Sequence, residues 1–456
     1  MTPSKTKAND SFYSHPRRVL WISGLASLFA YLYLAMVSQE YASASLGDLY
    51  IAVIPTALIS FYCFHYLNRA CIESRCSSFD PLILIIGFAV LFRIVGIATY
   101  PILEDDFFRY LWDGRLLVEK GSPYGIAPSE FFSDETLSSR FESILDTINY
   151  PYIATVYGPV CQWFFGAAYL IAPGELWPLK VFFVIADLII IALLYFWLKK
   201  LNLNYHALIL YAWSPLIIKE IAISLHPDVL AVCFSLAALL ALSSSRSFLA
   251  AILIALAVGG KVFALLLVPL ILQLYWQRWL LFAAVIATIS YPLGFIDAWI
   301  PEGLSAMAQS WFFNAPFYKA LSNFVSFTQS KIILLSLLAA FWLAGFYYPL
   351  YKGKPIESLR YDYLFGVFLL CIPVLNAWYL IWLLPFGVLF FSYWLWAASV
   401  LVLLISYSTG INTNHGGSAQ GLYELPTILL VFEFGVVLLL FIIEQTIQRN
   451  KKRPQY

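Results

Sequence analysis

Long apolar runs, separated by short polar segments, dominate the chain. An α-helix needs about 20 apolar residues to cross a bilayer, and about fourteen stretches approach that length. The runs lack the alternation of a membrane β-strand, so the pattern predicts an all-α polytopic membrane protein with about 12–14 spans. We expect the spans at residues 19–38, 48–67, 81–100, 178–198, 206–224, 229–243, 247–260, 262–276, 279–295, 331–351, 361–374, 378–391, 393–409 and 426–446. No convincing cleavage site follows the first stretch, so we expect a retained span rather than a signal peptide.

The basic residues fall on one side of these spans. With the N-terminus in the cytosol, seventeen of the 27 Lys and Arg residues lie in cytoplasmic segments, as the positive-inside rule requires. These residues are Lys5, Lys7, Arg17, Arg18, Arg69, Arg75, Lys199, Lys200, Arg246, Arg278, Lys352, Lys354, Arg360, Arg449, Lys451, Lys452 and Arg453. The pattern holds only if the apolar stretch 157–171 is not a span, and we interpret that stretch as interfacial or re-entrant because Gly158-Pro159 favours a break. The sequence therefore predicts cytoplasmic termini and an acidic extracytoplasmic face.

The composition agrees with a membrane location. Hydrophobic residues make up 61% of the chain and charged residues 12%, whereas soluble domains carry about 25% charged residues. The net charge of +1 gives no bulk attraction to nucleic acid. The six cysteines show no metal-binding spacing, and we interpret them as packing residues.

The candidate chemistry begins in the long outer segment 101–177. Asp106, Arg109 and Asp113 are spaced i, i+3 and i+7, so they share the polar face of one predicted helix. The opposite face is apolar and could lie on lipid; its members are Phe107, Phe108, Leu111, Trp112 and Val118. An N-terminal cap and a surface ion pair would explain this pattern without a function. Capping needs only one carboxylate, however. Glu104, Asp105 and Asp106 are adjacent and repel one another, which capping alone does not explain.

Polar groups at the ends of later spans point to the same side. An ionisable group in hydrocarbon costs roughly 2.5–3.5 kcal/mol or more, so such a residue is a functional candidate. Lys219 and Glu220 end one predicted span, His226 and Asp228 follow in the next outer turn, and Lys261 lies in another. A local Lys–Glu pair, a polar turn and a headgroup anchor are the alternative interpretations.

Three further ionisable residues lie inside predicted spans. We expect Arg93 to snorkel outward to the level of the acidic loop. We expect Asp187 and Glu433 to form helix–helix hydrogen bonds.

Nucleotide-binding motifs are missing from the sequence. It contains no GxxxxGK[ST], no GxGxxG after a strand and no HExxH. A substrate dissolved in the bilayer therefore fits better than a nucleotide-activated one.

Several segments together resemble the GT-C superfamily of integral membrane glycosyltransferases, in particular the bacterial polyprenyl-phosphate-mannose-dependent mannosyltransferases. The segments are EDDFFRYLWDGR at 104–115, VYGPV at 156–160, WSPLIIKE at 213–220, LHPD at 225–228, GKVF at 260–263 with Pro269, and NAWYLIWLLP at 376–385. The resemblance covers about residues 100–390. The acidic motif follows the third predicted span here, whereas superfamily members commonly have it after the first, which leaves the subfamily open.

The resemblance implies an enzyme that passes a hexose, most readily mannose, from a polyprenyl-phosphate carrier to an acceptor hydroxyl in a single inverting step. Asp106 would be the general base and Asp105 its neighbour. The implied substrate-binding residues are Glu104, Arg109, Asp113, Arg115, Tyr157, Lys219, Glu220, His226, Asp228, Lys261, Trp378 and Tyr379. The acceptor could be a glycolipid, a glycan or a protein, and Asp105, Asp106 and Asp228 could hold Mg²⁺ or Mn²⁺.

The same resemblance divides the chain into a GT-C-type bundle with one large catalytic loop. The parts are a cytoplasmic tail with three spans (1–100), the extracytoplasmic catalytic loop with interfacial helices (101–177), the central GT-C core (178–295), a second outer loop (296–330), the C-terminal spans (331–446) and a basic cytoplasmic tail (447–456). The implied location is the bacterial cytoplasmic membrane, with membrane lipids as partners and no nucleic acid. A transporter or flippase of lipid-linked sugars is the alternative, although such proteins more often show an internal repeat.

Overall fold

The computed structural model describes residues 16–72, 80–294, 297, 313–409 and 425–451. Within this part of the chain the fold is all-α, and its only β feature is an isolated bridge between Phe313 and Val374. The helices of the first half are α1 (Pro16–Val37), α2 (Leu46–Ile72), α3 (Leu82–Ala98), α4 (Asp106–Lys120), α5 (Ser139–Thr147), α6 (Pro159–Ile171), α7 (Trp177–Lys200), α8 (Ile209–Ala212), α9 (Pro215–Ile217) and the π-helix η3 (Ile218–Ile223). Those that follow are α10 (Asp228–Ser243), α11 (Ser247–Gly260), η4 (Val262–Leu266), α12 (Val268–Leu272), α13 (Trp276–Ser290), α16 (Pro316–Leu321), α17 (Phe327–Trp342), α18 (Tyr348–Tyr351), α19 (Tyr361–Cys371), η8 (Ala377–Trp382), α20 (Leu384–Leu389), α21 (Tyr393–Thr409) and α22 (Thr427–Lys451).

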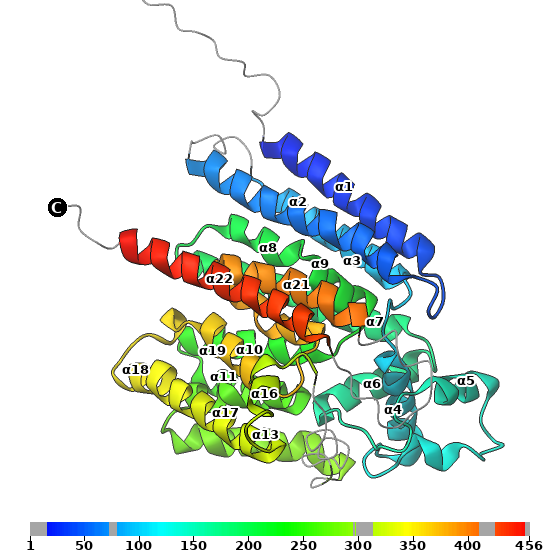
Figure 1. Cartoon of the computed structure of the whole chain (residues 1–456). Helices are drawn as coiled ribbons and strands as arrows, with labels where there is room; N and C mark the ends of the chain where they lie inside the picture. Colours follow the sequence, from blue (N-terminus) through cyan, green and yellow to red (C-terminus); the bar gives the residue numbers. More distant parts are fainter. Residues whose placement is uncertain (1–15, 73–79, 295–296, 298–312, 410–424, 452–456) are drawn as a thin grey trace, which may run out of the picture.

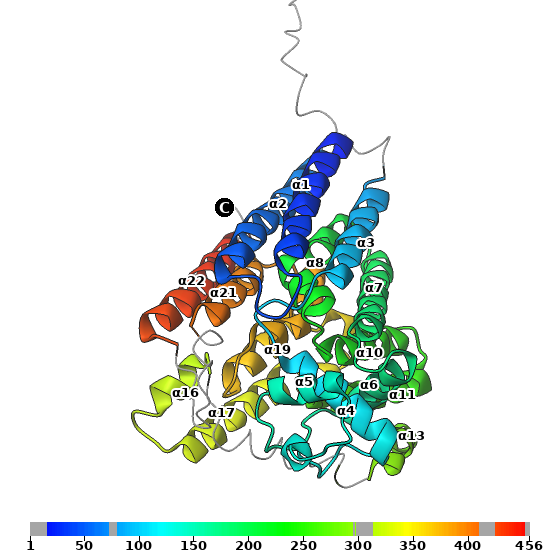
Figure 2. The ribbon, with the colours of Figure 1, turned by 90° about the vertical axis from the view of Figure 1, so that its right-hand side faces the viewer.

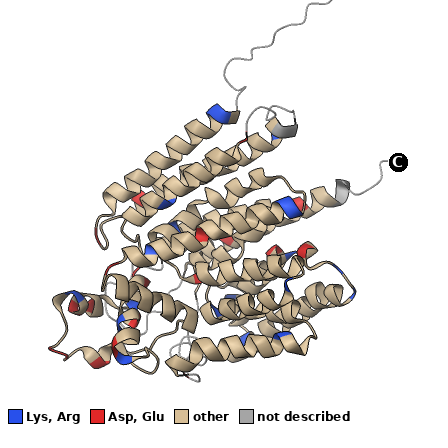
Figure 3. Cartoon of the chain, turned by 180° about the vertical axis from the view of Figure 1, so that it is seen from behind, with Lys and Arg blue, Asp and Glu red and all other residues tan. Residues whose placement is uncertain are grey.

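The long helices run side by side, and the smaller helices α4, α5 and α6 sit at one end of them (Figures 1 and 2). Helix α1 begins, and α22 ends, at the opposite end of this bundle (Figure 1). Charged residues gather on the α4–α6 unit, whereas the long helices carry few of them (Figure 3). The polar chemistry predicted for segment 101–177 is therefore concentrated at one end of an apolar bundle.

Among the described helices, five are long and apolar enough to cross a membrane. They are α1, α2, α7, the continuous stretch Phe327–Tyr351, and α22. A sixth candidate is the pair Tyr205–Ala212 and Pro215–Ile223, which is bent by 46°. Further apolar helices of 10–17 residues are α3, α6, α10, α11, α19 and α21. The protein is thus polytopic, with fewer full-length helices than the fourteen apolar stretches suggested.

Several predicted spans are not continuous helices, and a proline lies at the break in three of them. The stretch 206–224 divides into α8, α9 and η3, and Pro215 begins α9. The stretch 262–276 divides into η4 and α12, and the stretch 378–391 divides into η8 and α20. Pro269 and Pro385 lie at the starts of the second helices. A proline ring removes a backbone donor and clashes with the preceding turn, so a helix more readily restarts there than continues.

Arg93 does not snorkel outward, and that prediction was wrong. Its side chain is fully buried, and Nε lies 2.5 Å from Oδ2 of Asp187 in α7. Tyr211 donates a hydrogen bond of 2.8 Å to the other oxygen of Asp187. The buried guanidinium is therefore paired with a carboxylate of the neighbouring helix. Glu433 in α22 accepts a hydrogen bond of 3.2 Å from the loop residue Asn314, rather than from another helix.

The apolar face of α4 does not lie on lipid either. Phe107, Phe108, Leu111 and Trp112 are buried in the protein, and only Val118 is exposed. Helix α4 packs against α5 and α6, so the face meets neighbouring helices of its own chain. Four buried cysteines, Cys63, Cys161, Cys233 and Cys371, are free thiols, in keeping with packing roles.

Candidate active site

The acidic motif, Glu104-Asp105-Asp106, lies at the start of α4. Leu103 adopts φ 55°, a left-handed conformation that is unfavourable for a branched side chain. The bend at Leu103 comes directly before Glu104, and Asp106 is the first residue of α4. Non-glycine residues in this conformation cost on the order of 1–3 kcal/mol and persist only where the surroundings hold them. Here the contacts of the next residue, Glu104, keep Leu103 in this conformation.

Glu104 belongs to a buried ionic cluster that we name the Glu104 cluster: Glu104, Lys219, Glu220, His226 and Tyr407. The Lys219 Nζ atom lies 3.3 Å from Glu104 Oε1 and 3.3 Å from Glu220 Oε1. The His226 Nε2 atom lies 3.1 Å from Glu220 Oε2 and 3.5 Å from Glu104 Oε1. The Tyr407 hydroxyl donates to Glu104 and lies within hydrogen-bond distance of Glu220 and Lys219.

The charges of the Glu104 cluster balance when His226 is protonated. Burial alone would lower the pKa of His226, but the hydrogen bonds and charges of Glu104 and Glu220 raise it to about 9. Lys219 and His226 likewise outweigh the effect of burial and lower the pKa of Glu104. Two cations then face two carboxylates. The cluster ties the acidic motif to η3, to the following turn and to α21, and so fixes where α4 begins.

The cluster contains a set of residue types that could bind a metal. One ligand atom each of Glu104, Glu220 and His226 lies within 4.8 Å of the others. Lys219, however, places its ammonium beside both carboxylates, where a divalent cation would have to sit. A coordinating histidine must also be neutral, whereas the pKa of His226 is raised to about 9. The donor set therefore fits an internal ion network better than Mg²⁺ or Mn²⁺.

Asp106 lies beside the cluster and remains partly exposed. The Tyr157 hydroxyl donates to its Oδ2 atom across 3.5 Å, and the Tyr157 ring packs edge-on against Tyr110 at 5.0 Å. Burial and the Glu104 carboxylate raise the pKa of Asp106, while His226, Lys261 and Arg109 oppose the rise. These cations are thus close enough to act on the Asp106 carboxylate. Their charges keep it usable as a base despite its partial burial.

Asp105 is the second carboxylate of the motif. Burial, and then the like charges of Asp106 and Glu104, raise the pKa of Asp105 to about 7. Two adjacent carboxylates of like charge disfavour the ionised form of one another, so the site favours a state in which Asp105 is protonated near neutral pH.

Lys261 forms a cationic corner on the other side of the site. Its Nζ atom lies 3.2 Å from Asp228 Oδ2, and its side chain is 22% exposed. Trp382 Nε1 donates to the second Asp228 oxygen at 2.9 Å, so both oxygens of this buried carboxylate have a partner within the protein. The ammonium also lies 5.0 Å from the centre of the Tyr379 ring. Asp228 therefore orients Lys261, which keeps an accessible surface.

The loop before α6 brings Asp106 and Lys261 to the same site. A Cβ atom on Gly158 would come within 2.3 Å of the Gly259 carbonyl oxygen, so the loop presses directly on the end of α11. Tyr157 precedes this contact and Lys261 follows α11. Only glycine permits such close backbone approach. The start of α6 at Pro159 agrees with the break predicted there.

Two aromatic residues of η8 complete the site. Trp378 stacks on His226 with ring centres 4.1 Å apart and planes 11° apart, and Tyr379 lies beside Lys261. Both aromatic side chains are partly exposed. Flat aromatic faces next to a cation and a carboxylate suit a polar ligand with apolar C–H surfaces, such as a sugar.

Three predicted site residues have other surroundings. Arg109 donates to the carbonyl oxygens of Ile153 at 2.8 Å and Tyr150 at 3.0 Å, so it holds the loop that leads to Tyr157. Asp113 accepts hydrogen bonds from Thr155 and Gln162, which fixes the same loop. Arg115 faces away, pairing with Glu119 at 2.8 Å and packing on the Trp112 and Phe141 rings.

Tyr407 and Trp382 were not predicted from the sequence. Tyr407 lies in an apolar helix, where a tyrosine is usual without any polar partner. Trp382 falls inside the segment NAWYLIWLLP, but nothing in that pattern separates it from its neighbours. Only the fold shows that the Tyr407 hydroxyl meets the Glu104 cluster and that the Trp382 indole meets Asp228.

Comparison with known proteins gives one match. Residues 50–278 match the family described as Alpha-(1->6)-mannopyranosyltransferase, N-terminal domain. No curated protein and no solved structure matches the chain. The match spans half of the chain and contains every site residue from Glu104 to Lys261, whereas Trp378, Tyr379, Trp382 and Tyr407 lie beyond it. It confirms the resemblance to GT-C-type mannosyltransferases.

Proposed function

The chain belongs to the alpha-(1->6)-mannopyranosyltransferase family, and from that premise we propose that it transfers mannose from a polyprenyl-phosphate carrier to an acceptor hydroxyl at the extracytoplasmic membrane surface. The observation that carries the proposal is that the partly exposed Asp106 carboxylate lies close enough to the partly exposed Lys261 ammonium for the two charges to interact. A base and a cation are the two groups that a displacement at a sugar phosphate requires.

The proposed reaction is a single displacement at the anomeric carbon. Asp106 accepts the proton of the acceptor hydroxyl, the acceptor oxygen forms a bond to C1, and the bond from C1 to the phosphate oxygen breaks. The electron pair leaves with the polyprenyl phosphate, whose negative charge Lys261 stabilises. One displacement inverts the anomeric centre, so an α-linked product requires a β-linked donor.

The proposed sidedness has support in the arrangement of the helices. Both ends of the described chain lie at the end of the bundle that is remote from α4–α6 (Figure 1). Most basic residues fall in segments assigned to the cytosol, as the positive-inside rule requires. With both termini cytoplasmic in the bacterial inner membrane, Asp106 and Lys261 face the outer leaflet, where a lipid-borne donor can reach them.

The decisive experiment uses the purified full-length protein with labelled polyprenyl-phosphate-mannose, polyprenyl-phosphate-glucose and a membrane lipid extract. We expect label from the mannose donor to appear in an acceptor product, with free polyprenyl phosphate released in equal amount. A transporter or flippase, the alternative function, would move the intact donor across a vesicle without forming that product. Translocation without release of polyprenyl phosphate contradicts the proposal.

Lys261→Gln tests the role of the cation. A charged hydrogen bond to the carrier phosphate contributes about 1.5–3 kcal/mol, so the KM for the donor should rise about 10- to 100-fold. The KM for the acceptor should change much less. Steady-state kinetics with each substrate varied in turn measure both constants, and Lys354→Gln, an exposed lysine, is the matched control. A selective rise in the acceptor KM would assign Lys261 to the wrong substrate.

The raised carboxylate pKa values predict a specific pH dependence. The base must be ionised, so activity should fall as the pH drops through a value above the ordinary aspartate pKa of 3.8, because the pKa of Asp106 is raised. The pKa of Asp105 is raised to about 7, so Asp105 is mostly protonated on this limb, and Asp105→Asn should leave the limb in place. Profiles of kcat/KM for the wild type and for Asp105→Asn measure its position. A limb that disappears in Asp105→Asn would assign the role of base to Asp105 instead of Asp106.

A further inference from the structure

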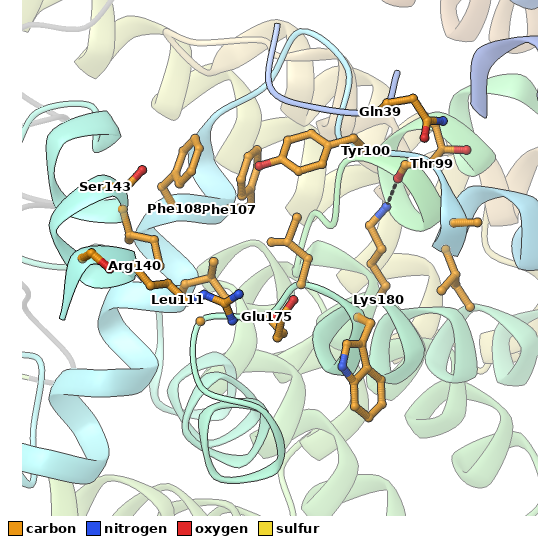
Figure 4. A pocket seen from close by; sticks show the side chains of 17 residues that line it. Gln39, Thr99, Tyr100, Phe107, Phe108, Leu111, Arg140, Ser143, Glu175 and Lys180 are labelled. Atoms are coloured by element: carbon orange, nitrogen blue, oxygen red, sulfur yellow. Dashed lines mark hydrogen bonds and ion pairs between the residues drawn. The ribbon is translucent and has the colours of Figure 1, made fainter. Parts of the chain in front are cut away.

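A cavity of about 610 Å³ lies behind the catalytic helix, on the side of α4 that carries Phe107, Phe108 and Leu111 (Figure 4). The opposite side of α4 carries Asp106 and Asp113. The end of α3, the start of α7 and helix α5 form its other walls. None of the residues assigned to mannosyl transfer lines this cavity, so it is a separate site.

Lys180 supplies the cavity with a buried positive charge. The residue is 2% exposed, and its Nζ atom donates to the Gly96 carbonyl at 3.0 Å and to the Thr99 carbonyl. An ammonium group has three donors, so one remains for a ligand. No carboxylate of the described residues pairs with Lys180. Burying an unpaired cation is costly, and a bound anion would offset that cost.

The rim of the cavity adds a second cation. Arg140 of α5 forms an exposed ion pair with Glu175, and both side chains line the cavity. The lining thus holds two cations and one carboxylate. Ser143, shown in Figure 4, and Ser139 add hydroxyl donors on the same helix. The electrostatic balance favours an anionic ligand.

Gln39, Thr99 and Gly174 also line the cavity, and the rest of the lining is apolar or aromatic. Its members are Ile97, Ala98, Tyr100, Phe107, Phe108, Leu111, Ile144, Leu176 and Trp177. The cavity sits where α3 ends and α7 begins, at the junction of the apolar bundle and the charged α4–α6 unit (Figures 2 and 4). In a membrane this junction is the level of the lipid headgroups. The ligand should therefore combine an anionic group with an apolar chain.

We propose that this cavity binds one anionic phospholipid of the bilayer, with its phosphate at the Lys180 ammonium and the start of its acyl chains against the apolar wall. The lipid acts as a resident structural ligand rather than as a substrate. It packs on the back of α4, the helix whose first residue is Asp106. Only the assignment of α3 and α7 to the membrane is needed for this inference, so it does not depend on mannosyl transfer.

The test measures lipid binding to the full-length protein in a neutral maltoside detergent, by native mass spectrometry and by thermal shift. The probes are phosphatidylglycerol, phosphatidylcholine and inorganic phosphate. We expect wild-type protein to bind phosphatidylglycerol more tightly than phosphatidylcholine, and inorganic phosphate to compete poorly. Equal binding of the two lipids, or binding of inorganic phosphate as tight as that of the anionic lipid, would overturn the proposal.

Two variants locate the site. Ser143→Trp places a large ring into the cavity from the exposed face of α5 and should weaken binding of phosphatidylglycerol by about tenfold or more; Glu142→Trp, an exposed neighbour outside the lining, is the control. Lys180→Met should abolish the preference for the anionic lipid. Lys180 also donates hydrogen bonds to the end of α3, so Lys180→Met can fail to fold for structural reasons alone. In that case the lipid affinity of Ser143→Trp is the test of the site. Wild-type affinity in Ser143→Trp would rule the cavity out.

Discussion

Asp106→Asn should lower the rate of mannosyl transfer about 10²- to 10⁴-fold, the usual contribution of a positioned general base. The amide has nearly the shape of the carboxylate but cannot accept the acceptor proton. The acceptor hydroxyl would then attack without assistance, while Lys261 remains in place to bind the donor and the Glu104 cluster still holds the start of α4. We therefore expect kcat to fall with little change in the donor KM.

The measurement is single-turnover transfer from labelled polyprenyl-phosphate-mannose. Asp146→Asn, an exposed aspartate of α5 in the same outer segment, should retain wild-type activity. The thermal unfolding midpoint of Asp106→Asn should match or slightly exceed that of the wild type, because the pKa of Asp106 is raised by burial and by Glu104. Near-normal turnover in a well-folded Asp106→Asn protein would remove Asp106 from the role of base and direct attention to Asp105.

Local sequence signals predicted the parts of the site that depend on neighbouring residues. The spacing of polar and apolar positions predicted one helix with Asp106, Arg109 and Asp113 on its polar face, and α4 spans Asp106–Lys120. Gly158-Pro159 predicted the break that opens α6. Lys261 was placed just after an apolar helix, and α11 ends at Gly260. Each of these features is decided by backbone chemistry within a few residues.

Contacts between side chains that are far apart in the sequence could not be predicted from such local signals. Arg93 was expected at the surface because a lone arginine in a span has no visible partner, yet Asp187 lies 94 positions away and meets it. Tyr407 joins the Glu104 cluster across an even longer separation. Hydropathy counts apolar residues and does not record which helices become neighbours. Ion pairs between distant spans are for this reason visible only in the fold.

The breaks in the predicted spans have a related cause. Hydropathy is nearly uniform across 262–276 and 378–391, but Pro269 and Pro385 end the helical hydrogen bonding there. The resulting short helices, η4 and η8, place Phe263 and Tyr379 beside Lys261, and Trp378 of η8 on His226. Interrupted helices at membrane depth are tolerated where they line a polar site. The failures of the span prediction thus fall next to the candidate chemistry.

Lys219→Met should destabilise the protein by about 3–5 kcal/mol, since removing one partner of a buried ion pair leaves an uncompensated charge. Glu104 and Glu220 would then face each other with only His226 between them. Methionine preserves the length of the side chain, so lost packing adds little. Thermal or denaturant unfolding in detergent measures the effect. Lys199→Met, at the exposed end of α7, should change stability by less than about 0.5 kcal/mol.

A second substitution separates charge balance from a mere loss of contacts. Lys219→Met combined with Glu220→Gln leaves one carboxylate, Glu104, opposite one protonated histidine, so the charges balance again. We expect the double variant to be more stable than Lys219→Met alone, although it lacks one more ionic group. If each contact contributed independently, the second change would instead lower stability further. Recovery in the double variant would show that Lys219 serves to neutralise the carboxylates that hold the start of α4 beneath Asp106.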